Sequence, residues 1–201
     1  MAKLALQLFL DVRLLFFISL SISSFLTFAA EPTISLVKDD VVVFLGGTDM
    51  VRAQRSGHLE TLLTWHFREE KPKFRDMSWQ ADTVFALGTE TERWRNGGYR
   101  GIKGLGNLET QLNNLKASVI IVQLGKNETF SGINGLEAFI QASNKLLGRL
   151  RGEDRKLIVI SPTKFEQAEN PLYPDLREKN SDLSYYVKEL KKSALKNEHF
   201  F

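Results

Sequence analysis

Short runs of apolar, mostly β-branched residues recur along this chain and are separated by longer amphipathic stretches. The clearest runs are residues 41–45, 119–124 and 157–160, and residues 74–77 form a weaker one. Nearly continuous apolar runs of this length are typical of strands that are covered on both faces, as in a parallel sheet. We therefore expect these four runs to form one parallel sheet.

Apolar residues recur at helical spacing between and after these runs. The stretches are 58–67, 108–115, 136–150 and 182–195. Strands that alternate with helices in this way indicate βαβ units. The expected fold is α/β, a three-layer α/β/α sandwich of the flavodoxin-like type around a parallel sheet. A chain of 201 residues has room for one such domain.

Two stretches do not fit the alternation. Residues 88–106, GTETERWRNGGYRGIKGLG, are rich in glycine and polar residues, which predicts a surface loop. Residues 170–180, NPLYPDLREKN, hold two prolines and are expected to form an irregular excursion before the last helix.

The N-terminus has the pattern of an export signal. Lys3 and Arg13 precede the apolar run LLFFISLSISSFLTFAA, which ends in small residues. We interpret residues 1–30 as a signal peptide cleaved near Ala29 or Ala30. An uncleaved N-terminal anchor is the alternative, and it would be the only membrane contact. Residues 31–201 then form the domain, in the periplasm or outside the cell.

Composition excludes several classes of function. Basic and acidic residues number 27 and 24 and are interleaved, which argues against a nucleic-acid partner. The absence of cysteine excludes disulfides, thiolate metal sites and thiol nucleophiles. Neither a Walker sequence, nor a dinucleotide-binding glycine pattern, nor a metal-ligand spacing of histidine and carboxylate occurs. We expect no cofactor and no metal.

Three segments follow the predicted strands directly and are the natural places for chemistry. They are GGTD, GKNE and SPTKFE, and in a parallel sheet they meet at the carboxyl ends of the strands. Thr48 places a hydroxyl there, beside Asp49. Thr48 is either a nucleophile or a turn residue that caps the next helix, and Asp49 is expected to form the turn.

These segments resemble the SGNH hydrolases, also called the GDSL esterase and lipase family. The nucleophile block is similar to VVFLGGTDMVRAQRSGHLETLL, the second block to FRDMSWQADTV and the third to QLGKNETFSG. The stretches LIVISPTKFE and YPDLREKN resemble a secreted bacterial branch of that family. The resemblance covers residues 39–196, and it implies that the last strand and helix of the family's fold are missing here.

The resemblance implies acyl transfer from an ester. Thr48 stands where the family has its serine nucleophile, and Asn127 stands where a side-chain amide donates to the oxyanion. Ala81 stands where the family has a glycine whose backbone N–H is a further donor. An ordinary helix cap is the alternative for Asp82 and Thr83, and a strand-end turn for Asn127.

The family's Asp-x-x-His does not occur in the sequence. His58, His66 and His199 lie elsewhere and are expected to be solvated or to pack. We therefore expect a hydrolase of acyl or acetyl esters, including those of carbohydrates, that is weak or inactive as this chain. The alternative is a non-catalytic binding or structural module. A missing last strand would leave an unpaired sheet edge, marginal stability and self-association.

Overall fold

The computed structural model describes residues 33–88, 107–167 and 169–201. Residues 35–201 group into one compact unit, which is the unit described below. The predicted signal peptide and nearly all of the predicted loop 88–106 lie outside the described residues. None of the helices in the described ranges is long and apolar enough to cross a bilayer.

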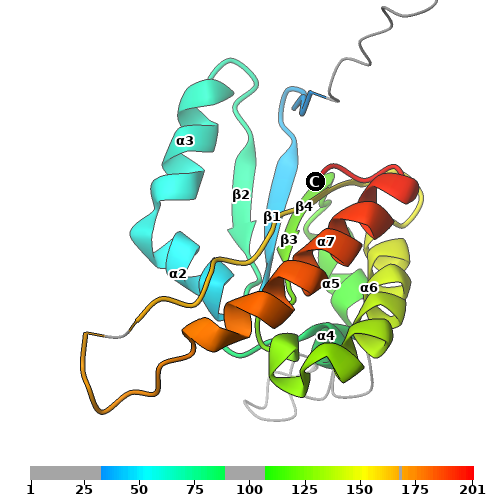
Figure 1. The fold of residues 1–201 in the computed structure, drawn as a ribbon. Coiled ribbons are helices and arrows are strands. Elements are labelled where there is room, and N and C mark those ends of the chain that lie inside the picture. Colours follow the sequence, from blue (N-terminus) through cyan, green and yellow to red (C-terminus); the bar gives the residue numbers. More distant parts are fainter. Residues whose placement is uncertain (1–32, 89–106, 168) are drawn as a thin grey trace, which may run out of the picture. The chain divides into compact units, whose positions relative to one another are not determined.

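The sheet has four parallel strands in the order β2-β1-β3-β4 (Figure 1). The strands are β1 (Val41–Gly46), β2 (Lys73–Asp76), β3 (Val119–Gln123) and β4 (Lys156–Val159). Every strand end lies within one residue of the corresponding end of a predicted run. The prediction of a parallel α/β sheet is confirmed.

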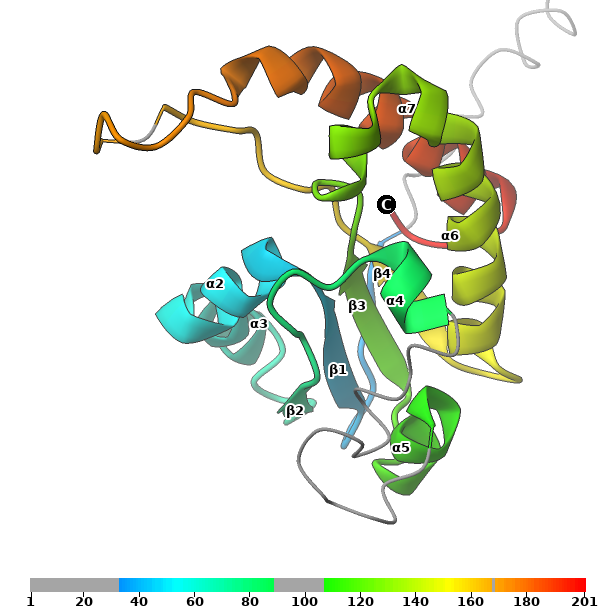
Figure 2. The ribbon, with the colours of Figure 1, turned by 90° about the horizontal axis from the view of Figure 1, so that it is seen from below.

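Helices cover both faces of this sheet, as Figures 1 and 2 show. On one face lie α2 (Thr48–Ser56) and α3 (His58–His66). On the other lie α4 (Val84–Gly88), α5 (Leu108–Asn114), α6 (Leu136–Arg151) and α7 (Asn180–Lys196). Short 3-10 turns follow β3 (Glu128–Ser131 and Ile133–Gly135) and precede α7 (Arg177–Lys179). The three-layer arrangement is as predicted.

The apolar runs form strands because the side chain of each residue packs into one of two hydrophobic cores, one on each face of the sheet. Along β3, Val119 and Ile121 pack with α2 and α3, whereas Ile120 and Val122 pack with α4 to α7. Successive side chains of a strand point to opposite faces, so a sheet covered on both sides needs an apolar residue at every position. In contrast, β2 is a short edge strand whose side chains are mostly exposed.

The edge of β4 differs in part from the prediction. Phe200 lies beside Ile158 in a parallel bridge, in which the Val159 N–H donates to the Phe200 carbonyl and the Phe200 N–H donates to the Leu157 carbonyl. The expectation of a wholly unpaired edge is therefore wrong, because the segment after α7 turns back and pairs with the middle of the strand.

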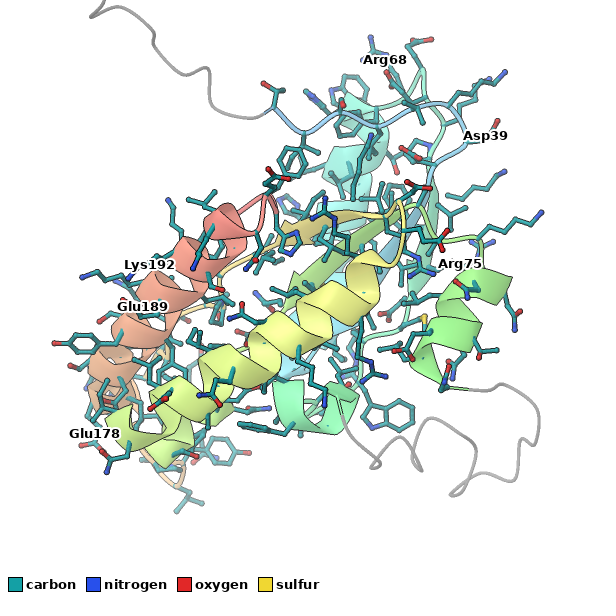
Figure 3. The ribbon with its side chains drawn as sticks, turned by 90° about the vertical axis from the view of Figure 1, so that its right-hand side faces the viewer. Asp39, Arg68, Arg75, Glu178, Glu189 and Lys192 are labelled. Carbon is teal, nitrogen blue, oxygen red and sulfur yellow. The ribbon has the colours of Figure 1, made fainter. Side chains whose placement is uncertain are left out.

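The outer side of α7 is exposed to solvent. Glu189 and Lys192 form an ion pair there (Figure 3).

Candidate active site

Two glycines allow the end of β1 to approach its neighbours closely. A Cβ atom on Gly46 would lie 2.4 Å from the carbonyl oxygen of Gln123, and the φ of +150° at Gly46 also favours glycine. A Cβ atom on Gly47 would lie 2.8 Å from the carbonyl oxygen of Asp82. These contacts bring the ends of β1 and β3 and the segment after β2 into one place.

Thr48 is the first residue of α2, and its hydroxyl does not cap that helix. Gly47 occupies the N-cap position and makes no side-chain cap bond. Instead, Thr48 Oγ1 accepts a hydrogen bond of 3.1 Å from the backbone N–H of Ala81. The capping interpretation of Thr48 is therefore wrong, and its hydroxyl faces the second block of the resemblance.

Ala81 adopts a backbone conformation that usually belongs to glycine. Its φ is +62°, in the left-handed region that a Cβ atom disfavours. The resemblance places a glycine at this position, and glycine would adopt this conformation without strain. The left-handed turn directs the Ala81 N–H toward Thr48.

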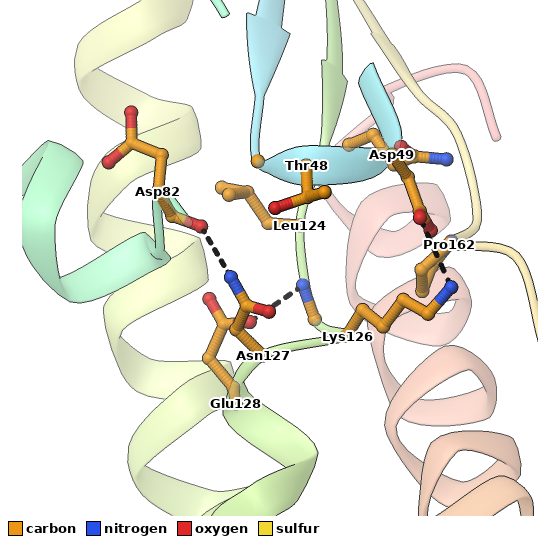
Figure 4. Close-up of a pocket in the computed structure, with 11 residues that line it drawn as sticks. Thr48, Asp49, Asp82, Leu124, Lys126, Asn127, Glu128 and Pro162 are labelled. Atoms are coloured by element: carbon orange, nitrogen blue, oxygen red, sulfur yellow. Dashed lines mark hydrogen bonds and ion pairs between the residues drawn. The ribbon is translucent and has the colours of Figure 1, made fainter. Parts of the chain in front are cut away.

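Asn127 follows β3 and extends its side chain toward the same segment. Its amide nitrogen Nδ2 donates to the Asp82 carbonyl over 3.3 Å, a long bond that uses one of the two amide protons (Figure 4). Next to Asp82, the hydroxyl of Thr83 accepts from the Ala86 N–H at the start of α4, as expected of a helix cap.

Thr48 and Asn127 line one pocket at the carboxyl ends of the strands (Figure 4). The enclosed cavity is only about 20 Å³, and the hollow around it is partly open to solvent. A cavity of this size holds about one water molecule, so the site has room for a small group at most. The remaining lining residues are Gly47, Asp49, Asp82, Gln123, Leu124, Gly125, Lys126, Glu128 and Pro162.

Asp49 and Lys126 form a largely buried ion pair at one side of the pocket. Lys126 Nζ lies 3.1 Å from Asp49 Oδ1, and the two side chains are 19% and 8% exposed. The backbone N–H and the hydroxyl of Thr163 donate to Asp49 Oδ2, over 3.0 and 2.8 Å. The prediction of Asp49 as a turn residue is wrong, because it is helical and joins the segments that follow β1, β3 and β4.

Glu128 lies on the other side of the pocket and is 4% exposed. Its carboxylate accepts hydrogen bonds from the N–H of Val84 (2.7 Å) and the N–H of Gly125 (3.0 Å). Burial raises the pKa of Glu128, while these backbone bonds oppose the shift and the nearby charge of Asp82 adds to it. Backbone N–H groups thus hold this side chain, and no lysine or arginine within the described ranges forms an ion pair with it.

None of the three histidines, all within the described ranges, lines the pocket. His58 and His66 are exposed on α3. His199 is 7% exposed, and burial together with the charge of Arg151 lowers its pKa. The described residues also hold no cluster of three or more potential metal ligands.

Sequence comparison gives no relative: no family model matches the chain, and no curated protein matches it. Comparison with solved structures does find similar folds. A gut microbial diltiazem-metabolizing enzyme matches with a TM-score of 0.62 at 12% identity, over 84% of this chain and 37% of that enzyme. A GDSL-like lipase from Bacteroides thetaiotaomicron matches with a TM-score of 0.50 at 15% identity, over 81% of this chain and 67% of the lipase.

This chain has the SGNH hydrolase fold. At such low identity the likeness establishes the fold alone, and the chain spans little more than a third of the first of these structures. The sequence resemblance and the structural likeness agree on the same fold. The roles that the resemblance implies for Thr48, Ala81 and Asn127 stay predictions.

Sequence reasoning missed Glu128 and the pair of Asp49 and Lys126. The pair had a signal: opposite charges directly after two strands become neighbours if those strands are adjacent in the sheet. Glu128 had a weaker one, an acidic residue between Asn127 and the buried Thr129.

Proposed function

We propose that this chain is an SGNH-type ester hydrolase that uses Thr48 as its nucleophile. The observation that carries the proposal is a convergence: a hydroxyl and a side-chain amide line one small pocket, and a backbone N–H from the neighbouring segment donates to that hydroxyl. The hydroxyl is that of Thr48, and the donors are the Ala81 N–H and the Asn127 amide. A nucleophile beside two hydrogen-bond donors is the arrangement that acyl transfer requires.

In the first step Thr48 Oγ1 forms a bond to the ester carbonyl carbon and gives its proton to a water molecule in the partly open pocket. The carbonyl π electrons move to oxygen, and the Ala81 N–H, released from Thr48 Oγ1, and the second amide proton of Asn127 donate to this oxyanion. Collapse breaks the ester C–O bond, and the departing alcohol takes a proton. Water then attacks the acyl-threonine, which releases the carboxylic acid and restores the hydroxyl.

Proton removal from Thr48 is the weak point of this site. No histidine within the described ranges lines the pocket, and the oxygens of Asp49 already accept from Lys126 and Thr163. A triad without its base retains roughly 10³-fold to 10⁴-fold acceleration over water. The γ-methyl group of threonine further restricts the approach of the hydroxyl. We therefore expect slow turnover by this chain.

The small enclosed volume leaves no room for a long acyl chain, so we propose esters with a short acyl group, above all acetyl esters. The alcohol part would then remain outside the pocket, and we propose acetylated carbohydrate as its source. The N-terminal pattern of residues 1–30 supports action outside the cytoplasm. The intact mass of the protein purified from its source tests this proposal, since cleavage near Ala30 removes a defined mass.

The central experiment compares three forms of the chain on p-nitrophenyl acetate. Thr48→Ala should lose the activity, whereas Thr48→Ser should exceed the wild type several-fold because it lacks the γ-methyl group. After subtraction of the direct reaction between imidazole and the ester, added imidazole should stimulate the wild type and Thr48→Ser but not Thr48→Ala, because it supplies a proton acceptor. Asn127→Ala should reduce kcat by about 10²-fold to 10³-fold.

Equal turnover by Thr48→Ala and the wild type would exclude Thr48 from the mechanism. If no form turns over, even with imidazole, the chain is instead a non-catalytic binding module. A screen for binding of acetylated and deacetylated oligosaccharides would then be the informative measurement.

A further inference from the structure

The carboxylate of Glu128 connects two segments that are far apart in the sequence. One oxygen, Oε1, accepts from Val84 N at the start of α4, and the other, Oε2, accepts from Gly125 N at the end of β3. No lysine or arginine among the described residues forms an ion pair with it, so backbone donors alone hold the charge. Each carboxylate oxygen thus binds a different segment.

Both segments carry a donor of the proposed oxyanion site. Val84 lies three residues after Ala81, whose N–H reaches Thr48, and Gly125 lies two residues before Asn127. The bond from Asn127 Nδ2 to the Asp82 carbonyl is long, at 3.3 Å, and joins the same two segments. The shorter bonds of Glu128 are therefore the stronger tie between them.

We propose that Glu128 is a positioning residue that sets the distance between the Ala81 N–H and the Asn127 amide. The proposal rests on the proposed function for the effect on turnover, but not for the effect on geometry. Glu128 touches neither Thr48 nor a bound ester in this scheme. It acts through the two segments that it joins.

A capping role at α4 alone explains only half of the contacts of Glu128. The bond to Val84 N serves the first turn of α4, but Thr83 already caps that helix through Ala86 N. The bond to Gly125 N, three residues earlier, closes the turn that leads into the 3-10 helix Glu128–Ser131. A cap of either helix alone would need only one carboxylate oxygen, whereas a link between the two segments needs both.

The charge at this position is costly for the folded state. Burial raises the pKa of Glu128, and Asp82 faces it with a like charge. The Tyr186 hydroxyl lies close enough for Glu128 to contribute to raising its pKa, after burial and Asp182. A neutral side chain would be easier to bury, so stability alone does not account for an acid at this position.

Glu128→Gln tests the proposal because it keeps the shape but offers only one acceptor to the two N–H groups. Glu189→Gln, on the exposed side of α7, is the matched control. Two readouts are needed. The first is the ¹H–¹⁵N signals of the Ala81 backbone amide and the Asn127 side-chain amide. The second is kcat and KM for p-nitrophenyl acetate, with imidazole added.

We expect Glu128→Gln to shift both amide signals and to lower kcat about 10-fold to 100-fold at nearly unchanged KM, because small displacements of catalytic groups have effects of this size. Its melting temperature should stay within about 4 °C of the wild type. The control should change none of these. Unshifted Ala81 and Asn127 signals, or a kcat equal to the wild type's where activity is measurable, would overturn the proposal.

The two proposals fail in distinguishable ways. Shifted amide signals in a protein that never turns over would support Glu128 as a positioning residue and reject the ester hydrolase. If Glu128→Gln does not fold, the wild type itself is titrated with acid. The Ala81 and Asn127 signals should then move with the same midpoint as those of Val84 and Gly125, and independence of the midpoints would reject the proposal.

Discussion

The segment that follows β3 is held from two sides in two different ways. On one side Lys126 meets Asp49 and Thr163, so opposite charges and neutral donors satisfy one another. On the other side Glu128 accepts from two backbone N–H groups and has no cation among the described residues. The two sides lie within one pocket, yet one compensates its charge and the other does not.

The difference teaches how the site divides its tasks. A paired charge supports the fold, since each partner offsets the burial of the other. An unpaired carboxylate gains little stability, but its two acceptors fix the relative position of two backbone segments. The Asp49 side is thus an anchor for three strand ends. The Glu128 side sets the geometry of the two proposed oxyanion donors.

The largest expected effect comes from breaking the anchor. Lys126→Met should lower the free energy of unfolding by about 2–3 kcal/mol, because it leaves the 8% exposed Asp49 carboxylate without its cation. Adding Asp49→Asn should recover about 1–2 kcal/mol of that loss. Urea unfolding at neutral pH measures all four members of the cycle.

Lys192→Met is the matched control for this cycle. Lys192 is 78% exposed and lies 3.6 Å from Glu189, so its loss should change stability by less than about 1 kcal/mol. Strictly additive effects of Lys126→Met and Asp49→Asn would show that the two sides of the pocket do not differ as described.

A smaller effect is expected at Ala81, on the Glu128 side of the pocket, where the backbone is strained. Ala81→Gly should stabilise the chain by about 0.5–1 kcal/mol, because relief of the left-handed φ exceeds the added freedom of the unfolded chain. Ala138→Gly, at an exposed position of α6, should instead destabilise by about 1 kcal/mol. Thermal unfolding of both variants tests the sign, and a destabilised Ala81→Gly would remove strain from the comparison.

The smallest expected effect is a change with pH in the stability of Glu128→Gln relative to the wild type, and the sign of that change is the test. Because the folded pKa of Glu128 is raised, its contribution to stability is complete below its ordinary value of 4.5 and is lost as the pH rises through the folded value. The unfolding free energy of Glu128→Gln should therefore improve relative to the wild type between pH 4 and pH 7. Denaturant unfolding at several pH values measures this difference. A change in favour of the wild type would contradict a costly buried charge.

Most of the fold could be predicted because the strands are buried on both faces. Residues 119–124 hold no polar side chain before Gln123, and such a run leaves few alternatives to a central strand. Helix α2 was not predicted, since only Met50 is fully buried and most of the other residues of the helix are polar. The pairing of Phe200 with β4 was also missed, because a single bridging residue after the end of a helix leaves no periodic pattern in the sequence.

The site could be predicted only at the level of its segments. Because the carboxyl ends of parallel strands lie at the same edge of a sheet, Thr48 and Asn127 were expected to lie together, and both line one pocket in the structure. The sequence could not show that the Thr48 hydroxyl accepts from the Ala81 N–H rather than capping α2. That contact depends on a left-handed backbone conformation at Ala81, which an alanine in the sequence does not predict. The role of Glu128 depends on two backbone N–H groups, which no side-chain pattern reveals.

The position of β1 in the middle of the sheet has a consequence for biosynthesis. The Val41 N–H bonds to the Ser118 hydroxyl, 77 residues later, so β3 must leave the ribosome before β1 is enclosed. Until then the run VVVFL has only the short strand β2 beside it. An apolar, β-prone stretch that waits this long is open to intermolecular pairing. The yield of soluble chain should therefore depend on the rate of translation and on chaperones during the synthesis of residues 46–123.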